Sequence, residues 1–86
     1  MKLTGGQIVV ETLIREGVPY LVGIPGHGTL GLSDALIGED RIQAIQVRHE
    51  QAAVHLAGAY YRVAGVPLAV FTSIGPGAMN TVIGVA

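Results

Sequence analysis

The segments of this chain alternate between two hydrophobic patterns, and this alternation limits its fold more than any other feature. Apolar residues recur at helical spacing in residues 7–14 and 50–64. Short apolar runs without that spacing stand at residues 20–24, 42–47 and 68–72. Read along the chain, helices and strands take turns, which is typical of a parallel sheet with helices packed on its faces. We therefore predict a three-layer α/β fold with a parallel sheet.

The ends of the predicted helices carry capping residues. Thr4 is followed three residues later by Gln7, a capping-box pattern, and Gly17 before the apolar Val18 indicates a helix stop. The first strand, residues 20–24, has no polar alternation and is expected to be buried on both faces. The other expected helices are residues 32–37, residues 50–64 ended by Gly65, and a last helix from Ala78.

Three loops follow the predicted strands, at residues 25–31, 48–50 and 73–80. The carboxyl ends of parallel strands lie at one edge of the sheet, and ligands of such sheets bind outside that edge. The functional site is therefore expected where these three loops meet.

The first loop has the glycine spacing of a dinucleotide-binding turn. Gly26, Gly28 and Gly31 follow a strand, and an acidic residue, Glu50, stands about 20 residues further on. Pro25 before the first glycine argues against this interpretation, as does the place of Glu50 at a helix start rather than a strand end. A nicotinamide-binding domain stays open as an alternative, and so does a tight turn without a ligand.

Glu50 begins the second long helix directly after a strand. A carboxylate in a first helical turn can be simply a solvated residue that the helix dipole stabilises. In a crevice beside an alanine-rich helix it would instead be partly desolvated, with a raised pKa that suits proton exchange with a bound base. The third loop contains Gly75-Pro76-Gly77, whose backbone can approach a flat ligand closely or merely form a tight turn.

Taken together and in order, these segments resemble the pyrimidine-binding domain of acetolactate synthase, benzaldehyde lyase and related thiamine-diphosphate enzymes. The resemblance covers essentially the whole chain and rests on Val22-Gly23-Ile24-Pro25-Gly26, Arg48-His49-Glu50-Gln51-Ala52-Ala53 and residues 72–80. It implies that residues 1–86 are the N-terminal part of that domain, truncated at its C-terminal end. It also implies part of a lyase or transferase that decarboxylates or ligates 2-keto acids with thiamine diphosphate.

The resemblance assigns a role to each matching residue. Glu50 matches the catalytic glutamate that hydrogen-bonds the aminopyrimidine ring of the cofactor and favours the tautomer that removes the thiazolium proton. Pro25 and Gly26 match a loop near the pyrimidine. The residues that match the Gly-Pro-Gly-x-x-Asn segment lining the pyrimidine pocket are Gly75, Pro76, Gly77 and Asn80.

Two features of the family are altered or missing. Some relatives carry a catalytic histidine two residues after the glycine that matches Gly26, where this chain has Gly28. His27 stands one place earlier, so for His27 and Gly28 only a substrate contact is predicted. Nothing matches the Gly-Asp-Gly…Asn segment with which a separate domain of the family anchors the diphosphate and Mg²⁺. The resemblance thus implies that Mg²⁺ is held by a domain absent from this chain, and that the fragment alone is inactive.

The composition predicts that other protein covers part of the surface of this chain. Half of its residues are apolar, 13% are charged, and the mean hydropathy is +0.54. A free-standing domain of this size needs a more polar surface. We expect a larger parent chain or partner subunits in a homodimer or homotetramer, as the family resemblance also implies. A non-catalytic fragment that only self-associates is a further alternative.

The net charge and the lengths of the apolar runs argue against several other classes of protein. The five basic residues are scattered and the net charge is −1, which argues against nucleic-acid binding. The start of the chain lacks the apolar core of a signal peptide, and no run approaches the roughly 18 apolar residues of a membrane span. The three histidines have no metal-ligand spacing. A cytoplasmic protein without a metal site of its own and without a membrane partner is therefore expected.

Overall fold

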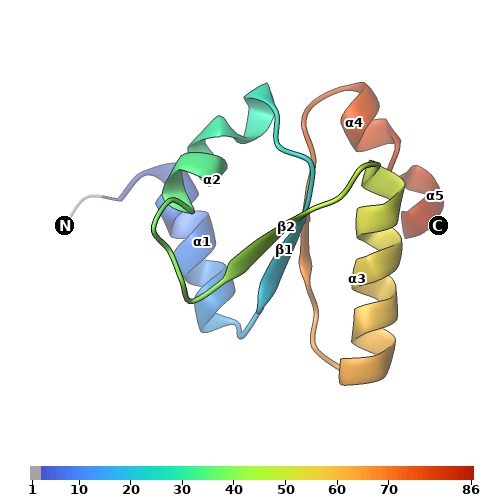
Figure 1. The fold of residues 1–86 in the computed structure, drawn as a ribbon, viewed down its shortest axis with the longest axis horizontal. Coiled ribbons are helices and arrows are strands. Elements are labelled where there is room, and N and C mark those ends of the chain that lie inside the picture. The colour runs from blue at the N-terminus through green and yellow to red at the C-terminus, as the bar shows by residue number, and fades with distance from the viewer. Residues whose placement is uncertain (1–2) are drawn as a thin grey trace.

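A computed structural model describes residues 3–86 as a sheet with helices on both sides (Figure 1). The sheet consists of β1 (Tyr20–Gly23), β2 (Gln43–Gln46) and β3 (Ala69–Phe71), parallel and in the order β2-β1-β3. Helices α1 (Gly5–Arg15) and α2 (Leu30–Ala35) lie on one side. On the other lie α3 (Glu50–Ala64), α4 (Pro76–Met79) and α5 (Val82–Val85). The predicted α/β fold is confirmed; Met1 and Lys2 of the predicted span lie outside the described residues.

The predicted ends of α1 are both confirmed. The backbone N–H of Gln7 donates to Oγ1 of Thr4 at 3.2 Å, and the N–H of Thr4 donates to Oε1 of Gln7 at 2.8 Å. Gly17 has a φ of 78°, and the N–H of Val18 donates to the carbonyl of Leu13 at 3.0 Å. This is the Schellman arrangement, which turns Val18 inward to join the core.

The central strand β1 is buried on both faces, as its sequence predicted. Leu21 and Val22 are 2% and 0% exposed. On the α3 side, the ring of Tyr20 meets that of Tyr60 edge-on with their centroids 5.9 Å apart. All three strands are slightly shorter than predicted. The core on the side of α1 and α2 consists of Val10, Val18, Leu21 and Ile42.

The prediction of α2 at residues 32–37 was wrong at both ends. A 3₁₀ turn, η1 (His27–Thr29), precedes the helix, which then begins at Leu30 and ends at Ala35. The glycine-rich loop thus contains a 3₁₀ turn directly before α2. That winding matters for the site, because it gives the first loop a fixed shape.

The single helix expected from Ala78 was also wrong, because the segment forms two helices of four residues each. The first begins earlier, at Pro76, whose fixed φ suits a first helical turn, and Gly75 before it has a φ of 66°. Oγ1 of Thr81 donates to the carbonyl of Ala78 at 2.6 Å. Such side-chain bonding competes with the helical pattern, and it occurs at the break between α4 and α5. None of the helices found between residues 3 and 86 is long and apolar enough to cross a membrane.

Candidate cofactor-binding site

The three loops after the strands meet at one edge of the sheet (Figure 1). A Cβ atom placed on Gly26 of the first loop would lie only 2.4 Å from Oγ of Ser73 in the third. A Cβ atom on Gly77 would lie 3.0 Å from Oε2 of Glu50. The first loop therefore rests on the third, and the third lies against the glutamate that begins α3.

Glu50 is held by Asn80, a residue 30 positions further along the chain. Nδ2 of Asn80 donates to Oε1 of Glu50 at 3.1 Å. This hydrogen bond lowers the pKa of the Glu50 carboxyl, and a hydrogen bond from the backbone N–H of Glu50 lowers it further. The predicted rise of this pKa was wrong, because these contacts outweigh the desolvation of a side chain that is only partly buried.

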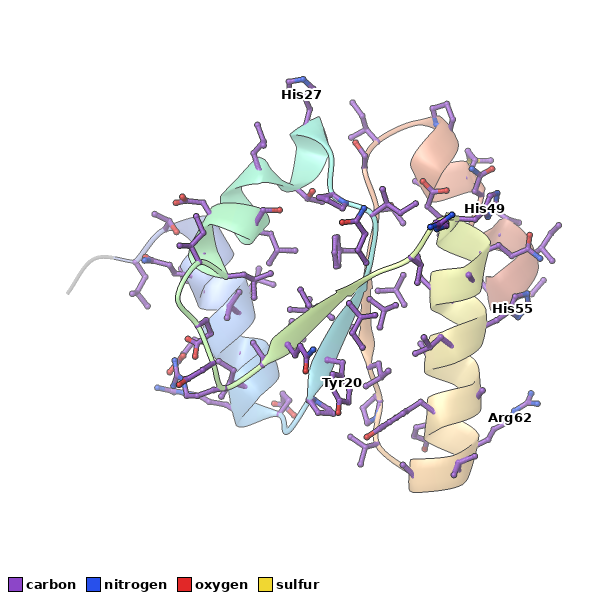
Figure 2. The ribbon with its side chains drawn as sticks, viewed as in Figure 1. Tyr20, His27, His49, His55 and Arg62 are labelled. Carbon is purple, nitrogen blue, oxygen red and sulfur yellow. The ribbon has the colours of Figure 1, made fainter. Side chains whose placement is uncertain are left out.

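His49 fixes the start of α3 and so the place of Glu50. Its backbone is extended, and its Nδ1 accepts a hydrogen bond from the backbone N–H of Gln51 at 3.0 Å. The imidazole thus acts as the N-cap of the helix, a function more often served by Ser, Asp or Asn. Figure 2 shows His49 at the end of α3 that faces the loops, whereas His55 lies further along the helix.

The Gly75-Pro76-Gly77 turn places backbone rather than side chains beside Glu50. Gly75 needs its positive φ of 66°, which a residue with a side chain adopts only with strain. Gly77 brings its backbone close to Oε2 of Glu50, since a Cβ atom there would lie 3.0 Å from this oxygen.

His27 and Gly28 belong to the 3₁₀ turn of the first loop. His27 is exposed and projects from the tip of η1, away from α3 (Figure 2). A Cβ atom on Gly28 would lie 3.0 Å from Cγ2 of Ile74, so this glycine packs on the third loop. Pro25 is exposed beside Gly26. Substrate contacts of His27 and Gly28 remain predictions.

Two residues of these loops had no predicted role: Ser73, which contacts Gly26, and Thr29, which closes the first loop. Thr29 is 8% exposed, and its Oγ1 accepts from the N–H of Gly26 at 2.9 Å and donates to the Gly26 carbonyl at 3.0 Å. A hydroxyl residue three positions after a loop glycine is a signal for such a bond. The same signal occurs at many exposed threonines, so alone it would not single out Thr29.

The described part of the chain has no group of three or more His, Asp or Glu side chains placed to hold a metal ion. The groups found beside the Glu50 carboxylate are the amide of Asn80 and the backbone at Gly77. This set suits hydrogen bonding to a neutral or weakly basic ring rather than the capture of a phosphate-bound cation.

A carboxylate facing a Gly-Pro-Gly turn at the carboxyl edge of a parallel sheet suits the binding of a flat, nitrogen-containing cofactor. Residues 3–86 match the family model "Thiamine pyrophosphate enzyme, N-terminal TPP binding domain", and the chain belongs to this family. The match favours this class over the dinucleotide-binding alternative.

Among characterised proteins, the chain is similar to acetolactate synthases. It is 45% identical over 84 residues to the acetolactate synthase large subunit of Haemophilus influenzae, covering 98% of this chain and 15% of that subunit. Identity is 43% to the isozyme 3 large subunit of Escherichia coli, with the same coverage. It is 41% over 80 residues to the mitochondrial catalytic subunit of Saccharomyces cerevisiae, covering 93% of this chain and 12% of that subunit. The chain thus spans about 15% of the length of the bacterial relatives.

Proposed function

We propose that this chain supplies the pyrimidine-binding part of a thiamine-diphosphate enzyme acting on 2-keto acids, with Glu50 as the cofactor-activating residue. The observation that carries the proposal is the state of the Glu50 carboxylate. One oxygen accepts from Asn80 at 3.1 Å, and the other faces the backbone edge at Gly77. The similarity to acetolactate synthases supports decarboxylation and carbon–carbon ligation as the reaction class.

The residues present fit an aminopyrimidine ring. In its imino or protonated form, such a ring carries a ring N–H that needs an acceptor, and the ring also needs a surface without side chains on which to lie. Oε2 of Glu50 provides the acceptor, and Gly75 and Gly77 provide backbone without Cβ atoms. When bound, thiamine diphosphate itself supplies the carbanion chemistry of the reaction.

The chain's own residues then have separate tasks. With the ring bound, Oε2 of Glu50 would accept a hydrogen bond from the protonated ring nitrogen and would take up that proton when the ring returns to its neutral amino form. Asn80 donates to Oε1 and would limit rotation of the carboxylate away from a bound ring. Since the same contact lowers the pKa of Glu50, the side chain is ionised at neutral pH before the ring binds.

Residues outside these 86 would hold the diphosphate and its Mg²⁺ and would form the substrate pocket. In the proposed assembly, the protein forms a homodimer or homotetramer in the cytoplasm. Another subunit of this oligomer completes the site. The 86-residue chain alone should consequently bind thiamine diphosphate weakly and turn over no substrate. A micromolar dissociation constant for thiamine diphosphate, measured by calorimetry on this chain, would contradict that expectation.

The test is an NMR titration of the ¹⁵N-labelled chain with thiamine. We expect shifts concentrated at Glu50, residues 75–77 and Asn80, and a several-fold weaker titration for Glu50→Gln. The matched control is Glu16→Gln, which alters an exposed carboxylate at the far end of α1. Unchanged thiamine binding by Glu50→Gln, or shifts that avoid the three loops, would refute the proposal.

The same substitution has a sharper consequence for catalysis. In an active enzyme that contains these residues, Glu50→Gln should leave folding nearly unchanged, because glutamine has the shape of glutamate. Turnover of a 2-keto acid should fall by orders of magnitude, because glutamine cannot exchange the proton. Near-normal turnover would remove Glu50 from the catalytic role.

A further inference from the structure

Thr29 is a buried polar residue at the end of the first loop, outside the set that the proposed function uses. Its side chain is shielded from solvent, so its hydroxyl needs partners within the protein. It finds both at Gly26: the Gly26 N–H donates to Oγ1 at 2.9 Å, and Oγ1 donates to the Gly26 carbonyl at 3.0 Å.

These bonds close residues 26–29 into a compact ring. The backbone N–H of Thr29 also donates to the Gly26 carbonyl, at 3.0 Å. Both polar backbone groups of Gly26 are therefore occupied by one residue. The position of Gly26 follows from the position of Thr29, which continues directly into α2.

The closed ring determines how the first loop meets the third. Gly26 lies so near Ser73 that a Cβ atom would come within 2.4 Å of its Oγ, and Gly28 similarly packs on Ile74. Ser73 and Ile74 lead directly into the Gly-Pro-Gly turn beside Glu50. A first loop that opened would thus withdraw support from one wall of the site.

We infer that Thr29 is a positioning residue of this site, whose hydroxyl holds Gly26 and the first loop against Ser73. Its link to cofactor binding rests on the proposed function, whereas the closing of the loop does not. The role requires a hydroxyl at this position, so serine should serve in place of threonine. Valine has the shape of threonine but leaves the Gly26 N–H without its acceptor.

The test compares Thr29→Val with Thr29→Ser by amide hydrogen exchange of the 86-residue chain, measured by NMR. In Thr29→Val, we expect exchange at Gly26 to accelerate by roughly fivefold or more, as the loss of one hydrogen bond implies. Exchange at the buried Val22 should stay nearly unchanged. Thr29→Ser should resemble the wild type at both amides. If the valine variant fails to fold, Thr29→Ala removes the same hydroxyl with less bulk.

A thiamine titration of the same variants then tests the link to the site. The valine variant should bind several-fold more weakly, and the serine variant should recover wild-type binding. Unchanged exchange at Gly26 in Thr29→Val would overturn the inference. Equal acceleration of exchange at Gly26 and Val22 would also overturn it, because it would indicate destabilisation of the whole domain. Wild-type thiamine affinity in a valine variant with an open loop would overturn it as well. If thiamine fails to bind the wild type, the proposed function fails, and the exchange data still decide the role of Thr29.

Discussion

Replacing Gly26 by alanine should disrupt the contact between the first and third loops. The backbone of Gly26 is extended, with φ −164° and ψ −170°, and alanine adopts this conformation freely. The cost of the substitution is therefore a matter of contact alone. The new methyl group would lie 2.4 Å from Oγ and 2.5 Å from Cβ of Ser73, whereas ordinary contact begins at 3.4 Å.

The structure sets the size of the effect. One of the two loops must retreat by roughly an ångström, and overpacking of this kind costs about 1–3 kcal/mol. Alanine also restricts the unfolded chain, which returns about 0.4–1 kcal/mol. We expect the free energy of unfolding to fall by a net amount of about 1.3 kcal/mol, within a range of about 0–2.6 kcal/mol.

A double-mutant cycle with Ser73→Gly isolates this contact. Ser73→Gly removes both atoms that the methyl group meets and leaves Cα at 3.7 Å, an ordinary contact distance. In that background, Gly26→Ala should be neutral or slightly stabilising. The coupling energy between the two positions should therefore be about 1–3 kcal/mol. Gly31→Ala is the matched control, because a Cβ atom there would meet nothing within 4 Å.

The assay is urea unfolding followed by circular dichroism. All variants are compared at one protein concentration, since association of the chain would alter apparent stability. A coupling energy below about 0.5 kcal/mol would refute the reasoning, because independent sites are additive to within that amount. So would a Gly31→Ala variant that loses as much stability as Gly26→Ala.

Two further predictions concern ionisation. Asn80→Ala should raise the pKa of the Glu50 carboxyl, because the substitution removes the hydrogen bond that lowers this pKa most. A ¹³C NMR titration of the Glu50 carboxyl measures the change. An unchanged pKa would contradict the prediction. Arg41 contacts Glu39 at 2.8 Å and Glu11 at 3.0 Å, and it lowers the pKa of Glu39 from 4.5 to about 2. A lowered carboxyl pKa gives stability that is present above the ordinary value and lost as pH falls. Arg41→Gln should therefore flatten the fall of stability between pH 4.5 and about 2, measured by urea unfolding, and an unchanged slope would contradict this.

The parts of the fold that could be predicted depend on residues close together in the chain. The capping box of Thr4 and Gln7 and the stop at Gly17 each involve bonds within a single helical turn or the next. The limits of α3, from Glu50 to the left-handed Gly65, are equally local. The alternation of apolar segments then led to the parallel sheet, because few other arrangements bury such runs.

The site was predicted in outline but not in its contacts. That the loops meet follows from the rule on strand ends, whereas the roles predicted for Glu50 and the glycine turn came from the resemblance to thiamine-diphosphate enzymes. The bond from Asn80 to Glu50 joins residues 30 positions apart, and its effect on the Glu50 pKa depends on a distance that no pattern contains. The support of Gly26 by Ser73 likewise depends on how two separate loops pack.

The apolar surface of the described chain leads to a prediction about association. Val63 on α3 is 90% exposed and Val85 on α5 is 75% exposed, and Met79 and Ile83 are exposed on the same side of the sheet. These four exposed apolar side chains favour contact with the surface of another protein molecule. We expect light scattering to give a mass above 8.9 kDa that rises with protein concentration. Ile83→Glu should lower that mass, because a charge is costly to bury, whereas Glu16→Gln should not. A mass that stays at 8.9 kDa at high concentration would contradict self-association and would mean that this surface is tolerated in water.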